Sequence, residues 1–244
     1  MEKIAGGVTA AKGFSAAHTA AGIKYQGRED MALIYSSEPC QTAGTFTSNV
    51  VKAAPVKWDR KLVEESAYTQ AVVVNAGIAN ACTGEEGMEY CRRTAECAGK
   101  ELDIPTDPVL VASTGVIGMQ LPMDRICEGI RSMAPQLSEE LAAGNGAAKA
   151  IMTTDTHEKE AAVTFTVDGA QVTVGGMCKG SGMIHPNMCT MLSFVTTDLA
   201  IEKELLQEAL RTVVEDTYNM ISVDGDTSTN DTCCILASGA AENQ

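Results

Sequence analysis

The 244-residue sequence has few aromatic residues and no surplus of positive charge. Phe, Trp and Tyr make up 4% of the residues, so the core is expected to consist of aliphatic side chains. A net charge of −14 repels phosphate backbones and anionic lipids, which argues against nucleic-acid and membrane partners. The sequence has no run of roughly 18 apolar residues that could span a membrane, and its start lacks the apolar segment of a secretory signal. These absences predict a cytoplasmic protein.

Common site patterns are also missing. The sequence contains no phosphate-binding P-loop, no dinucleotide-binding glycine motif and no serine nucleophile elbow. Three histidines are present, and none has a context typical of catalysis: His18, His157 and His185. Residues 224–231 are rich in aspartate but lack the glycine and glutamate of a calcium-binding EF-hand, so a polar turn or helix cap is expected. We therefore predict no metal and no permanently bound cofactor.

The cysteines show no C-x-x-C spacing. Their number is odd and the chain is not small, which argues against a disulfide framework or a zinc site. Reduced and mostly buried thiols are therefore predicted at all nine positions, namely Cys40, Cys82, Cys91, Cys97, Cys127, Cys178, Cys189, Cys233 and Cys234.

Hydrophobic patterns alternate between those of strands and those of helices, which predicts one domain of mixed α/β class. The Asp168–Gly169 pair predicts the tight turn of a β-hairpin, which argues against a purely parallel sheet. Apolar residues three and four positions apart predict helices, the last of them capped by Asp198. The expected strands are 71–77, 108–115, the two of the 161–176 hairpin and 232–239, and the expected helices are 86–102, 123–137 and 199–221.

With histidines and metals set aside, a hydroxyl or thiol nucleophile remains, and Thr190 is a candidate. Two glycines and Pro186 precede it and could bend the backbone, so that its hydroxyl attacks the carbonyl of Cys189. The cut would free the α-amine of Thr190, whose ordinary pKa of about 8 suits a general base. The residues alone leave open the alternative of a loop that leads into a buried strand.

Seven segments carry a family resemblance. Residues 179–198, KGSGMIHPNMCTMLSFVTTD, resemble the self-cleavage segment of the ornithine acetyltransferase family, the glutamate N-acetyltransferases of arginine biosynthesis. The other matches follow in family order, at 6–24, 42–56, 73–84, 111–118, 150–156 and 221–232. Because independent motifs agree along the whole chain, the sequence is identified as a member of this family.

The resemblance implies a self-cleaving enzyme with a threonine nucleophile. Cleavage between Cys189 and Thr190 would give an α chain, 1–189, and the start of a β chain, 190–244. Thr190 would take an acetyl group from N-acetylornithine and pass it to glutamate, a two-step acyl transfer.

The family's remaining site residues also have counterparts here. Thr114 and Gly115 match the positions of an oxyanion hole. Thr153 and Lys179, together with Thr190, match substrate-binding positions. The resemblance further implies a layered sheet-and-helix architecture shared with β-peptidyl aminopeptidases, and an assembly of two α and two β chains. It leaves open whether acetyl-CoA is also a co-substrate.

Two departures from the family pattern bear on these expectations. Cys189 stands where the family usually has alanine, but a thiol is small, so cleavage is still expected. Family members continue beyond the point that corresponds to residue 244, so the rest of the β chain is expected to be missing here.

Two alternative functions follow. One is a related aminopeptidase-type hydrolase, although those enzymes use serine at the position of Thr190. The other is an inactive, truncated protein that only binds or assembles.

Overall fold

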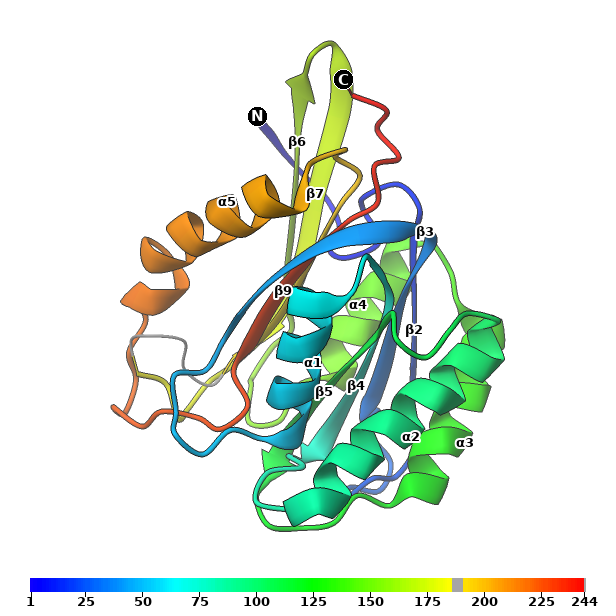
Figure 1. The fold of residues 1–244 in the computed structure, drawn as a ribbon, viewed down its shortest axis with the longest axis vertical. Coiled ribbons are helices and arrows are strands. Elements are labelled where there is room, and N and C mark those ends of the chain that lie inside the picture. The colour runs from blue at the N-terminus through cyan, green and yellow to red at the C-terminus, as the bar shows by residue number, and fades with distance from the viewer. Residues whose placement is uncertain (186–190, 244) are drawn as a thin grey trace.

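A computed structural model describes residues 1–185 and 191–243, which form a large bent sheet with helices packed around it (Figure 1). The strands are β1 (Glu2–Ile4), β2 (Phe14–Thr19), β3 (Met31–Phe46), β4 (Thr69–Ile78), β5 (Val109–Val116), β6 (Lys159–Val167), β7 (Ala170–Lys179), β8 (Leu192–Thr197) and β9 (Thr232–Ala237). The helices are α1 (Ala54–Glu65), α2 (Gly84–Leu102), α3 (Met123–Met133), α4 (Leu141–Ala150) and α5 (Lys203–Glu215), with short 3-10 turns η1 (Ala134–Gln136) and η2 (Tyr218–Met220).

The long strand β3 joins the two halves of the sheet. Within the described residues the strand order is β1-β6-β7-β8-β9-β3-β4-β5, and β2 pairs with β3 beside this path. The first part of β3 pairs with β2 and β4, its second part pairs with β9, and the register shifts between Tyr35 and Cys40. The pairs β4/β5 and β8/β9 are parallel and the other pairs are antiparallel, which confirms the predicted mixed α/β class.

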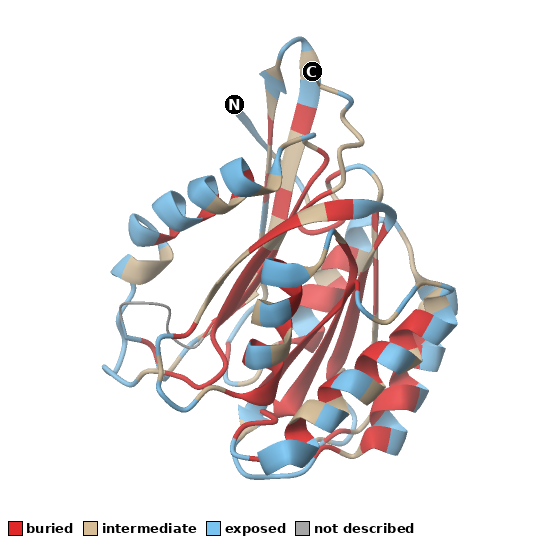
Figure 2. Ribbon diagram, in the orientation of Figure 1, coloured by how far each residue is buried: buried red, intermediate tan, exposed pale blue. Residues whose placement is uncertain are grey.

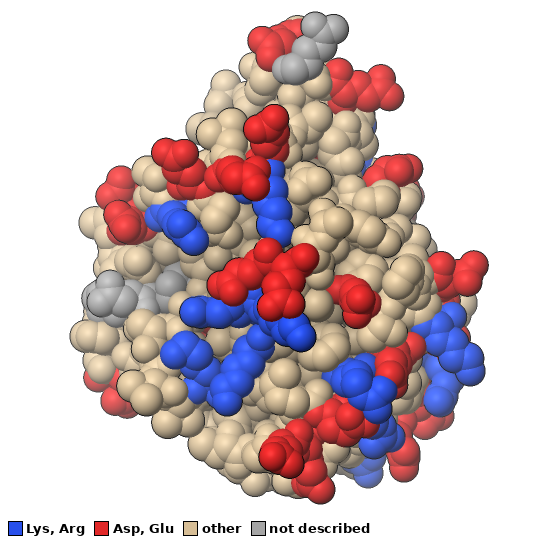
Figure 3. All heavy atoms as spheres, viewed as in Figure 1, with Lys and Arg blue, Asp and Glu red and all other residues tan. Residues whose placement is uncertain are grey.

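Helices cover both faces of β4 and β5, which explains why β4 is buried along its whole length (Figure 2). On one face, Val73 and Val111 pack in a cluster with Ile126 and Ile130 of α3. On the other face, apolar side chains of β4 and β5 share a cluster with α4, β8 and β9. Helix α5 packs against β3. Acidic and basic side chains are interspersed over the outer surface seen in Figure 3.

Most predicted elements are confirmed, with corrections at their ends. The predicted hairpin is formed by β6 and β7, and Asp168 and Gly169 adopt the positive φ angles that its tight turn requires. The helix predicted to extend to 221 ends at Glu215. The predicted cap at Asp198 was wrong, because its carboxylate accepts the backbone N–H groups of Lys12 and Thr173, and Glu202 precedes the helix instead.

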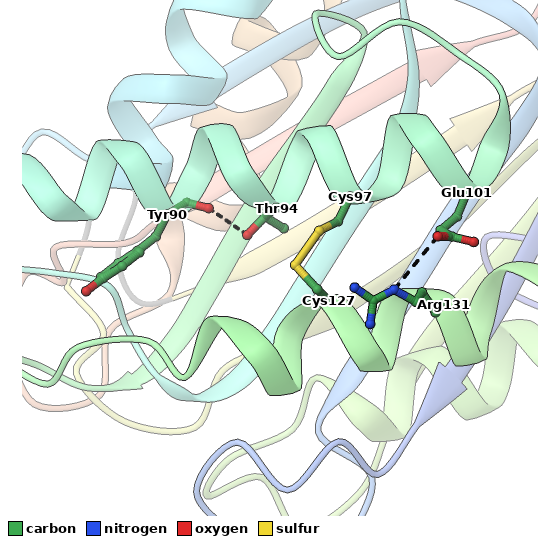
Figure 4. The surroundings of a disulfide bond; sticks show 6 residues. All are labelled: Tyr90, Thr94, Cys97, Glu101, Cys127 and Arg131. Carbon is green, nitrogen blue, oxygen red and sulfur yellow. Dashed lines mark hydrogen bonds and ion pairs between the residues drawn. A yellow bond between two sulfur atoms is a disulfide. The ribbon is translucent and has the colours of Figure 1, made fainter.

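The prediction of reduced thiols was wrong for one pair. Cys97 on α2 and Cys127 on α3 form a disulfide that links the two helices (Figure 4). Their Cα atoms lie 5.8 Å apart, a normal separation for a disulfide. Sequence spacing could not reveal this pair, because 30 positions separate the two residues and only the packing of the helices brings them together. The free cysteines among the described residues are Cys40, Cys82, Cys91, Cys178, Cys233 and Cys234.

Candidate active site

A pocket of about 370 Å³ opens where the ends of β5 and β7 meet several loops. It is lined by Tyr25, Ala79, Thr114, Gly115, Val116, Ile117, Thr153, Thr154, Lys179, Gly182, Met183, Ser228, Thr229 and Asn230. Four larger pockets, of about 430, 530, 540 and 770 Å³, contain none of the predicted site residues that the structure describes.

Four of the predicted site residues come together in this pocket, although they are spread over 66 positions of the chain. Thr114 and Gly115 come from the end of β5, Thr153 from the loop after α4, and Lys179 from the end of β7. Cys189 and Thr190 lie outside the described residues. The pocket therefore contains every predicted site residue that the structure places.

Gly115 lies where no side chain fits. It pairs with Gly77 of the parallel strand β4, and its φ is +132°, in the region that favours glycine. A Cβ atom at this position would lie 2.2 Å from the backbone carbon of Gly77. The close approach of two backbones explains why a glycine is required beside Thr114.

Buried amide groups tie the pocket wall together. Asn230 donates through Nδ2 to the carbonyl oxygens of Ala79, at 2.6 Å, and Ser113, at 2.8 Å. The hydroxyl of Ser113 in turn donates to Asn75 at 2.6 Å. Both asparagines are buried, so these bonds hold the loop before β9 firmly against the ends of β4 and β5.

Lys179 is a buried cation at the pocket wall. Only 3% of the residue is exposed, and its Nζ donates to the Thr114 hydroxyl at 3.3 Å. Burial lowers the pKa of Lys179, and the charges of Asp155 and Asp231 oppose that shift. Its burial sets Lys179 apart from an ordinary surface lysine solvated by water.

Asp155, which the sequence analysis did not single out, holds the Thr153 loop against β7. Its carboxylate accepts the backbone N–H groups of Gly180, at 2.8 Å, and Thr153, at 3.3 Å, and it binds Lys159 Nζ at 2.6 Å. Burial opposes ionisation of Asp155, but these bonds outweigh it and hold the pKa below its usual value. Asp155 thus ties Thr153 to the chain at the end of β7.

Residues 224–231 hydrogen-bond to the chain on both sides of residues 186–190, which the structure does not describe. Asp224 accepts the backbone N–H groups of Met183, at 2.6 Å, and Ile184, at 2.9 Å. At the other end, Asp231 accepts the N–H of Met191 at 2.9 Å. The expected polar turn therefore also organises the chain on either side of 186–190, a role that the composition of the segment did not reveal.

Asp231 is a fully buried carboxyl group. Burial raises its pKa to about 8, although the hydrogen bond from Met191, the nearby Ser228 hydroxyl and the charge of Lys179 act in the opposite direction. A carboxyl group that titrates near neutral pH is a common feature of active sites.

Other candidate chemistry lies elsewhere. His18 and His157 do not line the pocket. Among residues 1–185 and 191–243, no group of three or more His, Cys, Asp or Glu side chains could hold a metal ion. Within the same ranges, no helix has the length and apolar character needed to cross a membrane.

Comparison with family models and curated proteins shows which family the chain belongs to. The model of the ArgJ family matches residues 15–244. The chain is 54% identical over 245 residues to the arginine biosynthesis bifunctional protein ArgJ of Symbiobacterium thermophilum, which covers 100% of this chain and 60% of the relative. The corresponding protein of Thermotoga neapolitana is 51% identical and covers 95% of this chain and 58% of the relative. The chain therefore spans about 60% of the length of these relatives.

Solved structures agree with this assignment. The arginine biosynthesis bifunctional protein ArgJ of Bacillus halodurans is 42% identical with a TM-score of 0.73, over 78% of this chain and 97% of that chain. The ornithine acetyltransferase of Mycobacterium tuberculosis, complexed with ornithine, is 38% identical with a TM-score of 0.68, over 77% of this chain and 96% of that chain. An aminopeptidase of Ochrobactrum anthropi, at 12% identity and a TM-score of 0.58, shares the fold. The chain belongs to the ArgJ family.

Proposed function

We propose that this chain is part of an acetyltransferase that moves an acetyl group from N-acetylornithine to glutamate through an acetyl-Thr190 intermediate. The observation that carries the proposal is the meeting of Thr114, Gly115, Thr153 and Lys179 in one pocket. Membership of the ArgJ family and the likeness to an ornithine acetyltransferase that was solved with ornithine support the same reaction. The pocket volume of about 370 Å³ suits an amino-acid substrate.

The proposed nucleophile is made by cleavage of the Cys189–Thr190 bond. The α-amine that is freed on Thr190 then serves as the general base for its own hydroxyl. The extents of the matched structures support such a cut. The two solved relatives match over 78% and 77% of this chain, about 190 residues, and these matches cover 97% and 96% of their own chains. Chains of that length are expected if relatives are cut near the same place.

Pairing in the sheet would keep the two products together. The strand after the proposed cut, β8, hydrogen-bonds to β7 on one side and to β9 on the other. Leu192 and Phe194 are buried in the central apolar cluster. A cut chain would therefore stay associated through backbone hydrogen bonds and apolar packing.

In the first half-reaction, the Thr190 hydroxyl attacks the acetyl carbonyl of N-acetylornithine while its proton passes to the α-amine. The tetrahedral oxyanion is stabilised by donors of Thr114 and Gly115, each worth about 3 kcal/mol in comparable enzymes. The C–N bond then breaks, the ammonium proton passes to the departing amine of ornithine, and the acetyl group remains on Thr190 as an ester.

In the second half-reaction, the amine of glutamate attacks the ester and the Thr190 hydroxyl is regenerated. The buried ammonium of Lys179 binds a substrate carboxylate, because a cation held at the pocket wall has strong attraction for an anion in a poorly solvated place. Thr153 lies on the same pocket wall and contributes a polar contact to the substrate. We also propose that acetyl-CoA serves as an additional acetyl donor. The cut protein is proposed to assemble from two α and two β chains.

The test is a comparison of the full-length wild-type protein with its Thr190→Ala variant. We expect two wild-type bands on a denaturing gel, one of which begins TMLSF, and transfer of acetyl from N-acetylornithine to glutamate. The variant should stay uncut and transfer nothing. An uncut wild-type protein with full transfer activity would contradict the mechanism, and acetate release without any dependence on glutamate would indicate a hydrolase.

A further inference from the structure

The proposed cleavage needs a proton acceptor that the proposed transfer reaction does not supply. The α-amine of Thr190 cannot act in the cut, since it exists only after the cut. A group already present in the uncut chain must therefore take the hydroxyl proton. This inference rests on the proposed function, because it concerns the step that creates the nucleophile.

Three ionisable groups near the pocket can be compared. Asp155 has both carboxylate oxygens engaged, with Gly180, Thr153 and Lys159. Lys179 in its charged form has no lone pair with which to accept a proton. Asp231 differs from both, because its Oδ1 accepts the Met191 N–H at 2.9 Å while its Oδ2 has no hydrogen-bond partner among the described residues.

Hydrogen bonds with both backbone groups of Met191 fix Asp231 and Thr232 beside it. The backbone N–H of Met191 donates to the Asp231 carboxylate, and its carbonyl oxygen accepts the N–H of Thr232 at 3.0 Å. The carbonyl oxygen of Asp231 itself accepts the N–H of Thr47 at 3.0 Å. The nitrogen of Met191 is bonded to the carbonyl carbon of Thr190. These hydrogen bonds therefore hold the Asp231 carboxyl group within one residue of the Cys189–Thr190 bond.

We propose that Asp231 is the general base of self-cleavage, which takes the Thr190 hydroxyl proton and returns it to the leaving nitrogen. The hydroxyl oxygen attacks the carbonyl carbon of Cys189 as its proton passes to the Asp231 carboxylate. The bond from that carbon to the Thr190 nitrogen then breaks, and Asp231 gives the proton to the nitrogen. The product is an ester between residue 189 and the Thr190 side chain, with a free α-amine. Water attacks this ester, which yields the carboxylate of residue 189 and restores the hydroxyl.

The electrostatic setting suits this exchange. Lys179 of β7 is the charged group that acts on Asp231, and Lys179 is in turn influenced by Asp155 and Lys159. The Ser228 hydroxyl and the Met191 N–H are the polar groups that favour the ionised form. With a pKa of about 8, Asp231 exchanges its proton at a pH where both of its forms are populated.

The chain offers a matched control in Asp59 of α1. This carboxyl is also fully buried, its Oδ1 accepts the Val111 N–H at 2.8 Å, and its Oδ2 lacks a partner within the described ranges. Asp59 does not line the pocket. A buried carboxyl with one free oxygen is therefore not by itself a proton acceptor for the cut, and it is the position beside Met191 that distinguishes Asp231.

The experiment times the cleavage of full-length precursor made by cell-free translation, between pH 5.5 and 9, for the wild type, Asp231→Asn, Asp231→Glu and Asp59→Asn. The amide oxygen of Asp231→Asn can still accept the Met191 N–H. We expect the wild-type rate to rise with pH and level off near pH 8. In Asp231→Asn the rate should fall about 100-fold or more and lose this inflection. Asp231→Glu should regain the inflection at an intermediate rate, and Asp59→Asn should match the wild type.

The other outcomes would overturn either the role of Asp231 or the proposed function. Cleavage of Asp231→Asn within twofold of the wild type, or with the same inflection, would overturn the role of Asp231 and leave the proposed acetyltransferase intact. Failure of the wild type itself to cleave would overturn the proposed function. If Asp231→Asn does not fold, as judged by limited proteolysis, the pH profiles of the wild type and Asp231→Glu decide, and a wild-type profile without an inflection overturns the proposal.

Discussion

The ammonium group of Lys179 lies 3.3 Å from the hydroxyl of Thr114, although 65 positions separate the two residues. The first ends β7 and the second lies near the end of β5, so two different halves of the bent sheet meet at this contact. It places a positive charge beside one of the two proposed oxyanion-hole residues.

Replacement of this cation should weaken the reaction more than the fold. In Lys179→Met the side chain keeps a similar size, and removal of a buried charge relieves its desolvation cost, so the melting temperature should change little. Loss of a charged contact to a substrate carboxylate costs about 1.5–3 kcal/mol, so kcat/KM for acetyl transfer should fall by about 10- to 150-fold. Steady-state kinetics with the full-length protein would measure this change. Lys149→Met is the control, because Lys149 is exposed and pairs with Glu158 outside the pocket, and its kinetics should match the wild type.

The close contact of Gly115 with Gly77 predicts a large steric effect. In Gly115→Ala the added Cβ would lie 2.2 Å from a backbone atom, so we expect a loss of about 3 kcal/mol or more of unfolding free energy. Gly118→Ala is the matched control, since Gly118 also has a positive φ, of +84°, but a Cβ there meets nothing within 4 Å. Its loss should be about 1 kcal/mol from backbone strain alone. Denaturant unfolding would compare the two, and equal losses would contradict the steric explanation.

The bonds of Asp155 predict a loss of stability in acid. Its pKa is lower in the folded chain than its ordinary value of 3.8, so its contribution is present above pH 3.8 and is lost as the pH falls through the folded pKa. Asp155→Asn should lower the unfolding free energy by about 2 kcal/mol at pH 7, and the difference from the wild type should shrink toward pH 3. Urea unfolding at a series of pH values would test this, and a constant difference would show that ionisation of Asp155 does not contribute.

The raised pKa of Asp231 predicts the opposite trend. The folded state binds one more proton than the unfolded state between about pH 4 and pH 8, so stability should fall across this window as the pH rises. The slope should reach at most about 1.4 kcal/mol per pH unit. The measurement is urea unfolding of the uncut Thr190→Ala protein with and without Asp231→Asn. The second substitution should make the protein relatively more stable toward pH 8, and parallel pH curves would argue against a raised pKa.

The disulfide between Cys97 and Cys127 predicts stability that depends on reductant. A crosslink across 30 positions typically contributes about 2–4 kcal/mol, so reduction should lower the melting temperature. Acetyl transfer below that temperature should not change, because neither cysteine lines the pocket. The double variant Cys97→Ser/Cys127→Ser should melt at the temperature of the reduced wild type and show no further response to reductant. A response in the double variant would point to another cysteine.

Two elements that the sequence analysis did not predict, α4 and β3, lack a clean periodic signal. Helix α4 is rich in alanine and glycine, and it packs so closely that a Cβ at Gly146 would lie 2.0 Å from the His18 ring. Its small residues reflect that close packing, but in the sequence they resemble a loop. Strand β3 changes register partway along, so its pattern of buried residues is interrupted.

What the sequence determined by itself is the class of fold, the places of β4, β5, β6, β7, β9, α2, α3 and α5, and the motifs that identify the family. These features depend on local patterns, because a tight turn, an apolar repeat or a short motif is formed by residues that are close together in the sequence. The sequence also named Thr114, Gly115, Thr153 and Lys179 as site residues, through resemblance.

Only the tertiary structure decided which groups lie together and in what environment. The burial of Lys179, the Cys97–Cys127 bond and the burial of Asp231 beside Met191 depend on contacts between segments far apart in the chain. Asp231 is the clearest case, because its residue type indicates an ordinary exposed carboxylate in a polar turn. Burial beside Lys179 and Met191 makes it a carboxyl that titrates near neutral pH, since the energy of a charge depends on the solvent and the groups around it.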